Sequence, residues 1–136
     1  MEITADLKEL LESIEYNGLW ESLKDIFPHI GRIGSDNFAF MIGNKNGRDA
    51  LLLNCRVANH LEESECAIKK LLARCESNPK DFTGNMDLAL CCYEQAASNL
   101  ELSIQSCERL DINNWLIFAN RSHYFLFEFL KFYDSI

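Results

Sequence analysis

The chain contains little glycine and proline and no long hydrophobic run. Its 136 residues include 6 Gly and 2 Pro, which is too few for a disordered or low-complexity protein. No apolar stretch reaches the roughly 20 residues that a transmembrane helix needs. The opening stretch MEITADLKELLES is charged from Glu2 onward, unlike a secretory signal. We therefore expect a cytoplasmic protein without a membrane segment, folded as one domain over residues 1–136.

Motifs for the common cofactors and metals are also missing. The sequence has no CxxC pair, zinc-finger spacing, Walker loop, G-x-G-x-x-G or E-x-x-H motif, so we expect no cofactor and no metal site. It does contain 6 Cys. In a reducing compartment these thiols are expected to be reduced and mostly buried. Cys55 and Cys66 fall on the outer side of their predicted helix, which predicts that they are the accessible ones.

Positive charge is scarce. The chain has 13 Lys and Arg against 21 Asp and Glu, a net charge of −8 at pH 7. An acidic protein repels phosphate backbones, so we do not expect direct nucleic-acid binding, whereas a protein partner with a basic surface would suit it. The G-x-x-G turn from Gly31 to Gly34 is similar to the phosphate-contacting loop of KH domains. Arg32 is its only basic residue, and the pattern fits an ordinary turn better.

Helical periodicity dominates the rest of the sequence. Apolar residues recur at helical spacing in two short segments, near 3–16 and 19–27, and in three long ones, 49–76, 85–110 and 113–134. Short connectors between the long segments favour antiparallel packing, so the fold class we predict is all-α, an antiparallel bundle of about four helices. The glycines predict a loop or small hairpin over 29–48. Residues 38–53 fit either a hairpin or the start of the next helix, and we favour the helix.

Aromatic residues are concentrated in the last predicted helix, NWLIFANRSHYFLFEFLKFYDSI, which holds eight of the fifteen. Its apolar arc covers more than half of a helical wheel, which indicates packing on two sides. Ile117, Tyr124 and Phe132 interrupt the polar strip of the wheel. Either other segments of the chain cover these three residues, or the three form an interface with a polar rim. The predicted binding residues on this strip are Ile117, Arg121, Tyr124, Glu128 and Phe132.

The stretch RVANH places Arg56 and His60 four positions apart, on one side of a helix. This pair resembles the R-x4–6-H motif of HEPN ribonucleases, although the spacing is one residue short. The resemblance implies an RNA-cleaving helical bundle that dimerises to pair two such motifs. Another alternative is a small-molecule or metal sensor in the bundle core, where His60, His123, Cys75 and Cys107 fall on or near buried faces.

The lack of a catalytic motif favours a protein that acts by binding. Small size, acidity and surplus aromatic residues are typical of adaptors, immunity proteins and inhibitors, which regulate a protein partner without catalysis of their own. Self-association into a homodimer is compatible with the same features. A protein-binding function is therefore our first hypothesis, with the ribonuclease and the core sensor as alternatives.

Overall fold

The computed structural model describes residues 19–81 and 83–136, and within these ranges all regular structure is helical. The all-α prediction is thus confirmed. The helix predicted near 3–16 lies outside the described residues, and the four-helix arrangement that depends on it stays a prediction. The elements are α2 (Leu19–Leu23), α3 (Pro28–Ile33), α4 (Ser35–Ile42), α5 (Lys45–Ser77), the 3₁₀ turn η1 (Pro79–Asp81), α6 (Gly84–Glu108) and α7 (Ile112–Asp134).

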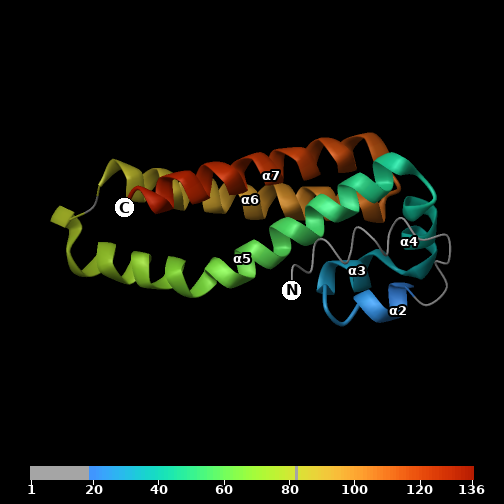
Figure 1. Ribbon diagram of the computed structural model, residues 1–136, viewed down its shortest axis with the longest axis horizontal. Helices are drawn as coiled ribbons and strands as arrows, with labels where there is room; N and C mark the ends of the chain where they lie inside the picture. Colours follow the sequence, from blue (N-terminus) through green and yellow to red (C-terminus); the bar gives the residue numbers. More distant parts are fainter. Residues whose placement is uncertain (1–18, 82) are drawn as a thin grey trace.

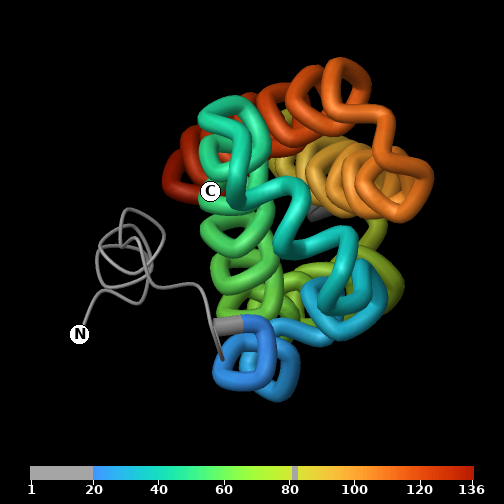
Figure 2. Tube along the Cα trace, turned by 90° about the vertical axis from the view of Figure 1, so that its right-hand side faces the viewer, coloured from blue at the N-terminus to red at the C-terminus, as the bar shows by residue number. Residues whose placement is uncertain are grey.

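The three long helices set the shape of the molecule. α6 and α7 run antiparallel and side by side along its length, and α5 crosses them obliquely (Figure 1). The short helices α2, α3 and α4 gather at the end where α5 begins and where the chain turns from α6 into α7 (Figures 1 and 2). Short connectors explain the antiparallel order, because a helix that turns back after a few residues packs on its predecessor.

The glycine-rich segment differs from the predicted loop or hairpin, because it forms the two short helices α3 and α4. Gly34 has φ +84°, a conformation that favours glycine, and it turns the chain between these helices. Gly47 is buried in α5 against Met41, and a Cβ placed there would overlap the Met41 carbonyl group. These glycines therefore serve a tight turn and a close helix contact.

The start of α5 also lies earlier than the predicted start at residue 49. The Asn44 side chain accepts hydrogen bonds from the backbone N–H groups of Asn46 (2.9 Å) and Gly47 (3.4 Å), which caps the helix. The segment 38–53 is therefore helical on both sides of this cap, without a hairpin. The sequence interpretation that favoured a helix here was right, but it placed the start of the helix at residue 49.

The buried side chains form two clusters along the molecule. The first joins α2, α3, α4 and the start of α5 to the turn between α6 and α7, and it includes the fully buried Trp115. The second lies between the middle of α5 and the pair α6 and α7, and it includes Val57, Leu126 and Phe129. Between the clusters, the Ser103 hydroxyl lies 3.0 Å from Asn54 Oδ1 and 3.1 Å from the carbonyl oxygen of Trp115, so a buried polar contact joins all three long helices.

The cysteines are free thiols, as predicted, but only half of them are buried. Cys66 is exposed, in agreement with the prediction, whereas the prediction for Cys55 was wrong because this residue is buried. Helices α2 to α4 cover the side of α5 that carries Cys55, and His29 Nε2 lies 3.6 Å from its Sγ. Burial raises the pKa of the Cys55 thiol, and it raises the pKa of Cys107 to about 12.

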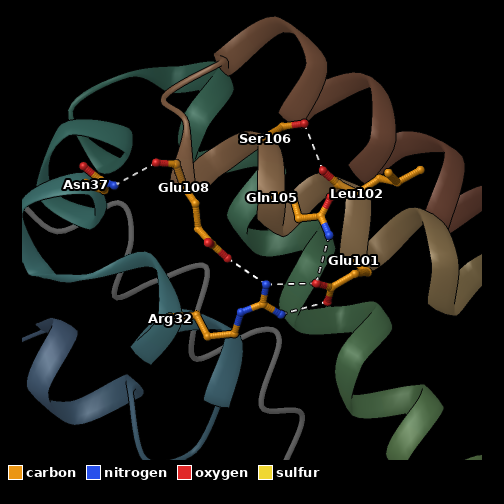
Figure 3. Close-up of polar contacts among 7 residues, drawn as sticks. All are labelled: Arg32, Asn37, Glu101, Leu102, Gln105, Ser106 and Glu108. Atoms are coloured by element: carbon orange, nitrogen blue, oxygen red, sulfur yellow. Dashed lines mark hydrogen bonds and ion pairs between the residues drawn. The ribbon is translucent and has the colours of Figure 1, made fainter.

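An ion-pair network fastens α3 to α6 (Figure 3). The Arg32 guanidinium donates to both carboxylate oxygens of Glu101, at 2.8 and 2.9 Å, and to Glu108 Oε1 at 2.7 Å. These contacts lower the pKa of the Glu101 carboxyl, chiefly through the hydrogen bond from Arg32. The only basic residue of the G-x-x-G segment is therefore paired with carboxylates, which does not fit a phosphate-binding loop. The predicted turn is confined to Gly34, because Gly31, Arg32 and Ile33 belong to α3.

Candidate functional site

Helix α7 begins at a capped turn and packs with one side against α5 and α6. The Asp111 side chain accepts hydrogen bonds from the backbone N–H (3.4 Å) and the side-chain amide (2.6 Å) of Asn114. The side that packs against α5 and α6 is buried. Because α7 has 23 residues, its opposite side presents an outward face about 35 Å long. The buried residues are Trp115, Ala119, Ser122, Leu126 and Phe129.

The five predicted binding residues lie along one edge of this outward face, which we call the outer strip. Ile117 and Tyr124 have 45% and 58% of their surface exposed, and Arg121 is exposed as well. Glu128 and Phe132 are half-buried, and Phe132 packs against the second core cluster. Of the three apolar residues on the strip, Ile117 and Tyr124 are therefore exposed, whereas Phe132 lies at the boundary between the core and the surface.

Half-buried phenylalanine rings support the exposed members of the outer strip. The Arg121 guanidinium lies over the Phe118 ring, 5.6 Å from its centroid. Tyr124 meets the neighbouring Phe125 ring edge-on at 5.4 Å, and Lys131 Nζ lies 5.6 Å from the centroid of the Phe132 ring. Cation–π and edge-to-face contacts of this kind hold side chains against the helix surface. Within residues 19–81 and 83–136, neither Arg121 nor Glu128 forms an ion pair.

Sequence reasoning missed Phe127, which is 57% exposed. The wheel placed it in the wide apolar arc, which we interpreted as a surface packed on two sides. Its position at the edge of that arc, beside the exposed Tyr124, was the available signal. The Phe127 ring stands at 89° to the ring of His123, with 4.7 Å between the two centroids.

A cluster of basic side chains lies in the seam between α5 and α7. Arg56 Nη1 is 3.3 Å from His123 Nε2. Because a guanidinium can only donate, this nitrogen of His123 accepts and the imidazole is neutral. The pKa of His123 is lowered mainly by burial, and further by the positive charges of Arg56 and His60. The structure thus adds His123 to the two residues of the RVANH stretch.

The residues suggested for a core sensor do not gather in the core. The His60 side chain is 40% exposed and Cys75 is half-buried, whereas Cys107 belongs to the first core cluster. Among the described residues, no group of three or more His, Cys, Asp or Glu could hold a metal ion. Two open surface pockets, of about 300 and 390 Å³, lie beside the second half of α5. Their lining includes Leu71 and Tyr133 in the first and Leu72 and Leu90 in the second.

Comparison with known proteins gives no family assignment: no family model, no curated protein and no solved structure matches the chain. In the part of the chain that the structure describes, no helix is both long and apolar enough to cross a membrane. The outward face of α7 and the seam between α5 and α7 are the two candidate sites.

Proposed function

We propose that the protein acts by binding another protein through the outward face of α7, as an adaptor, immunity protein or inhibitor does, without catalysis of its own. The observation that carries this proposal is the exposure of Tyr124 and Phe127, two large aromatic side chains three positions apart on the side of α7 that faces away from the core. Aromatic residues are enriched at protein interfaces and depleted on free surfaces because their burial in a complex removes much apolar area from water.

The surroundings of these aromatic residues support the same proposal. Ile117 extends the apolar line towards the start of α7, and the exposed Arg121 and Lys131 together with the half-buried Glu128 border it. An apolar centre with a polar border is the usual composition of an interface. The net charge of −8 would speed association with a partner that carries a basic surface.

The proposal can be tested by affinity capture from the native host with two double variants. In the first, Tyr124→Ser and Phe127→Ser remove the aromatic pair. In the second, Ile26→Ser and Phe40→Ser remove two apolar side chains of similar exposure (57% and 54%) outside α7. Both variants should keep the fold, because substitutions at exposed sites usually change stability by less than about 0.5 kcal/mol.

The two variants should differ in what they retain. We expect proteins captured by the wild type to be lost with the α7 variant and kept with the control variant. If the α7 variant captures the same proteins as the wild type, or if both variants lose them equally, the outward face of α7 is not the binding surface.

The basic cluster favours a second candidate function, the RNA cleavage that the HEPN resemblance implies. Arg56 lies against His123, and His60 follows Arg56 one turn along α5. A neutral imidazole could accept the proton of an RNA 2′-hydroxyl, and a protonated imidazole could donate a proton to the leaving oxygen. A guanidinium could stabilise the charge on the phosphoryl group.

A cleavage assay separates this candidate from protein binding. If the cluster cleaves RNA, His60→Ala and His123→Ala should each lower the rate by about a hundredfold or more. Tyr124 lies on the outward face of α7, so Tyr124→Ser should leave the rate of RNA cleavage unchanged. A purified wild-type protein that leaves structured and single-stranded RNA intact would rule out the ribonuclease function.

A further inference from the structure

We propose that the partner on the outer strip is a second copy of this chain, bound with the two α7 helices antiparallel about a two-fold axis beside Tyr124. This inference rests on the proposed function, because it names the partner of the same helix face. It comes from the order of side chains along the strip. The strip has an apolar residue at each end, a charged residue next to each end and Tyr124 in the centre, and the two charges have opposite signs. In chain order the residues are Ile117, Arg121, Tyr124, Glu128 and Phe132.

The spacing makes this order self-complementary. Ile117 and Phe132 lie equally far from the midpoint between Tyr124 and Phe125, and so do Arg121 and Glu128. When two such helices lie antiparallel about that midpoint, Arg121 meets Glu128 of the partner subunit and Ile117 meets the partner's Phe132. A two-fold axis produces each pair twice, as in an isologous dimer.

Three phenylalanine rings, one in the outer strip and two beside it, fit the same arrangement. Phe118, Phe125 and Phe132 follow one another at intervals of seven residues, and all three are half-buried. A seven-residue repeat keeps side chains on the seam between two helices that pack along their length. Phe125 would lie at the two-fold axis, and Phe118 would lie near the partner's Phe132. A second α7 would therefore cover the ring surface that the monomer leaves open.

The charges of the strip also select the orientation. Neither Arg121 nor Glu128 has an oppositely charged partner among the described residues, so both are available to a second chain. A parallel pair would place Arg121 beside Arg121 and Glu128 beside Glu128, which is repulsive. A uniformly basic partner would meet Arg121 as a like charge. The contact is one helix wide, which is small for a protein interface, and two copies that each carry a net charge of −8 repel one another at long range. We therefore expect reversible association in the micromolar range that becomes stronger as salt screens the net charges.

Sedimentation equilibrium on single charge reversals tests the inference. The wild type should form a reversible dimer below about 100 µM, and Arg121→Glu or Glu128→Arg should each weaken it by about tenfold or more, since each reversal creates two like-charge contacts. Arg109→Glu is the matched control, because Arg109 is exposed and forms no ion pair with a described residue. Its dimer should be as strong as that of the wild type.

Mixing the two reversed variants gives the sharpest result. Arg121→Glu makes the strip wholly acidic and Glu128→Arg makes it wholly basic, so an equimolar mixture should form a heterodimer that is tighter than the homodimer of either variant alone. A wild type that stays monomeric to about 200 µM, or a dimer that tolerates both single reversals, would overturn the inference. The proposed function is judged separately, by capture with Tyr124→Ser and Phe127→Ser, so the two can fail independently.

Discussion

The contact between Gly47 and Met41 predicts a large effect of adding one methyl group. Gly47 is buried in the first turn of α5, where the backbone of α4 passes directly over it. A Cβ at this position would lie 2.8 Å from the carbonyl carbon and 3.1 Å from the Cα of Met41, and it would overlap the carbonyl oxygen. No side-chain rotation relieves such a contact, because the obstacle is backbone. Gly47→Ala must therefore move α4 away from α5.

The size of the effect follows from these distances. Carbon atoms pack best at about 3.5–4.0 Å, so the two helices must separate by about 1 Å, and a gap of that width removes a quarter to a half of the dispersion energy of the atoms it separates. Phe38, Met41 and Ile42 of α4 are buried in the first core cluster and would lose packing. Overpacking costs about 1–3 kcal/mol, and an obstacle made of backbone puts this site at the upper end of that range. Alanine regains up to about 1 kcal/mol of helix propensity, so we expect a net loss of about 2 kcal/mol.

Urea denaturation of Gly47→Ala and Gly84→Ala measures this loss with an internal control. Gly84 begins α6, and a Cβ there would meet no atom within 4 Å. Gly84→Ala should therefore be neutral or stabilise the fold by about 0.4–1 kcal/mol, because it restricts the unfolded chain. If Gly47→Ala is as stable as the wild type, α4 does not pack on α5 in the way described.

Three further predictions concern pH, stability and thiol access. Burial lowers the pKa of His29 from 6.5 to about 4. As the pH falls, this histidine is therefore protonated in the unfolded chain before it is protonated in the folded one, and the free energy of unfolding should decrease by up to about 3 kcal/mol between pH 6.5 and 4. Urea denaturation of His29→Gln should show a smaller decrease over that range. In thermal melts, Phe129→Ala should cost about 3–5 kcal/mol and Tyr124→Ala less than about 0.5 kcal/mol; equal losses would contradict the exposure of Tyr124. A thiol reagent should label the exposed Cys66 and Cys91 rapidly in the native protein, and the three buried cysteines only after unfolding.

The long helices could be predicted from the sequence because they follow from the spacing of apolar residues within each segment. Hydrophobic periodicity and short connectors predicted helices over 49–76, 85–110 and 113–134, and the structure has them at Lys45–Ser77, Gly84–Glu108 and Ile112–Asp134. The glycine-rich segment was harder to predict. A glycine in a flexible loop and a glycine beneath another backbone look the same in a sequence, so only the position of Met41 explains Gly47.

The candidate site was partly predictable for the same reason. The wheel of α7 put Ile117, Arg121 and Tyr124 on one strip opposite the centre of the apolar arc, but it left open whether other segments cover that strip, and the structure exposes all three. The surroundings of Cys55, Phe127 and His123 could not be predicted, since they depend on segments distant in the chain. Helices α2 to α4 bury Cys55, Phe127 stays in solvent, and the packing of α5 on α7 brings His123 to Arg56. Periodicity determines which side chains share a face of a helix, whereas packing between helices determines what that face meets.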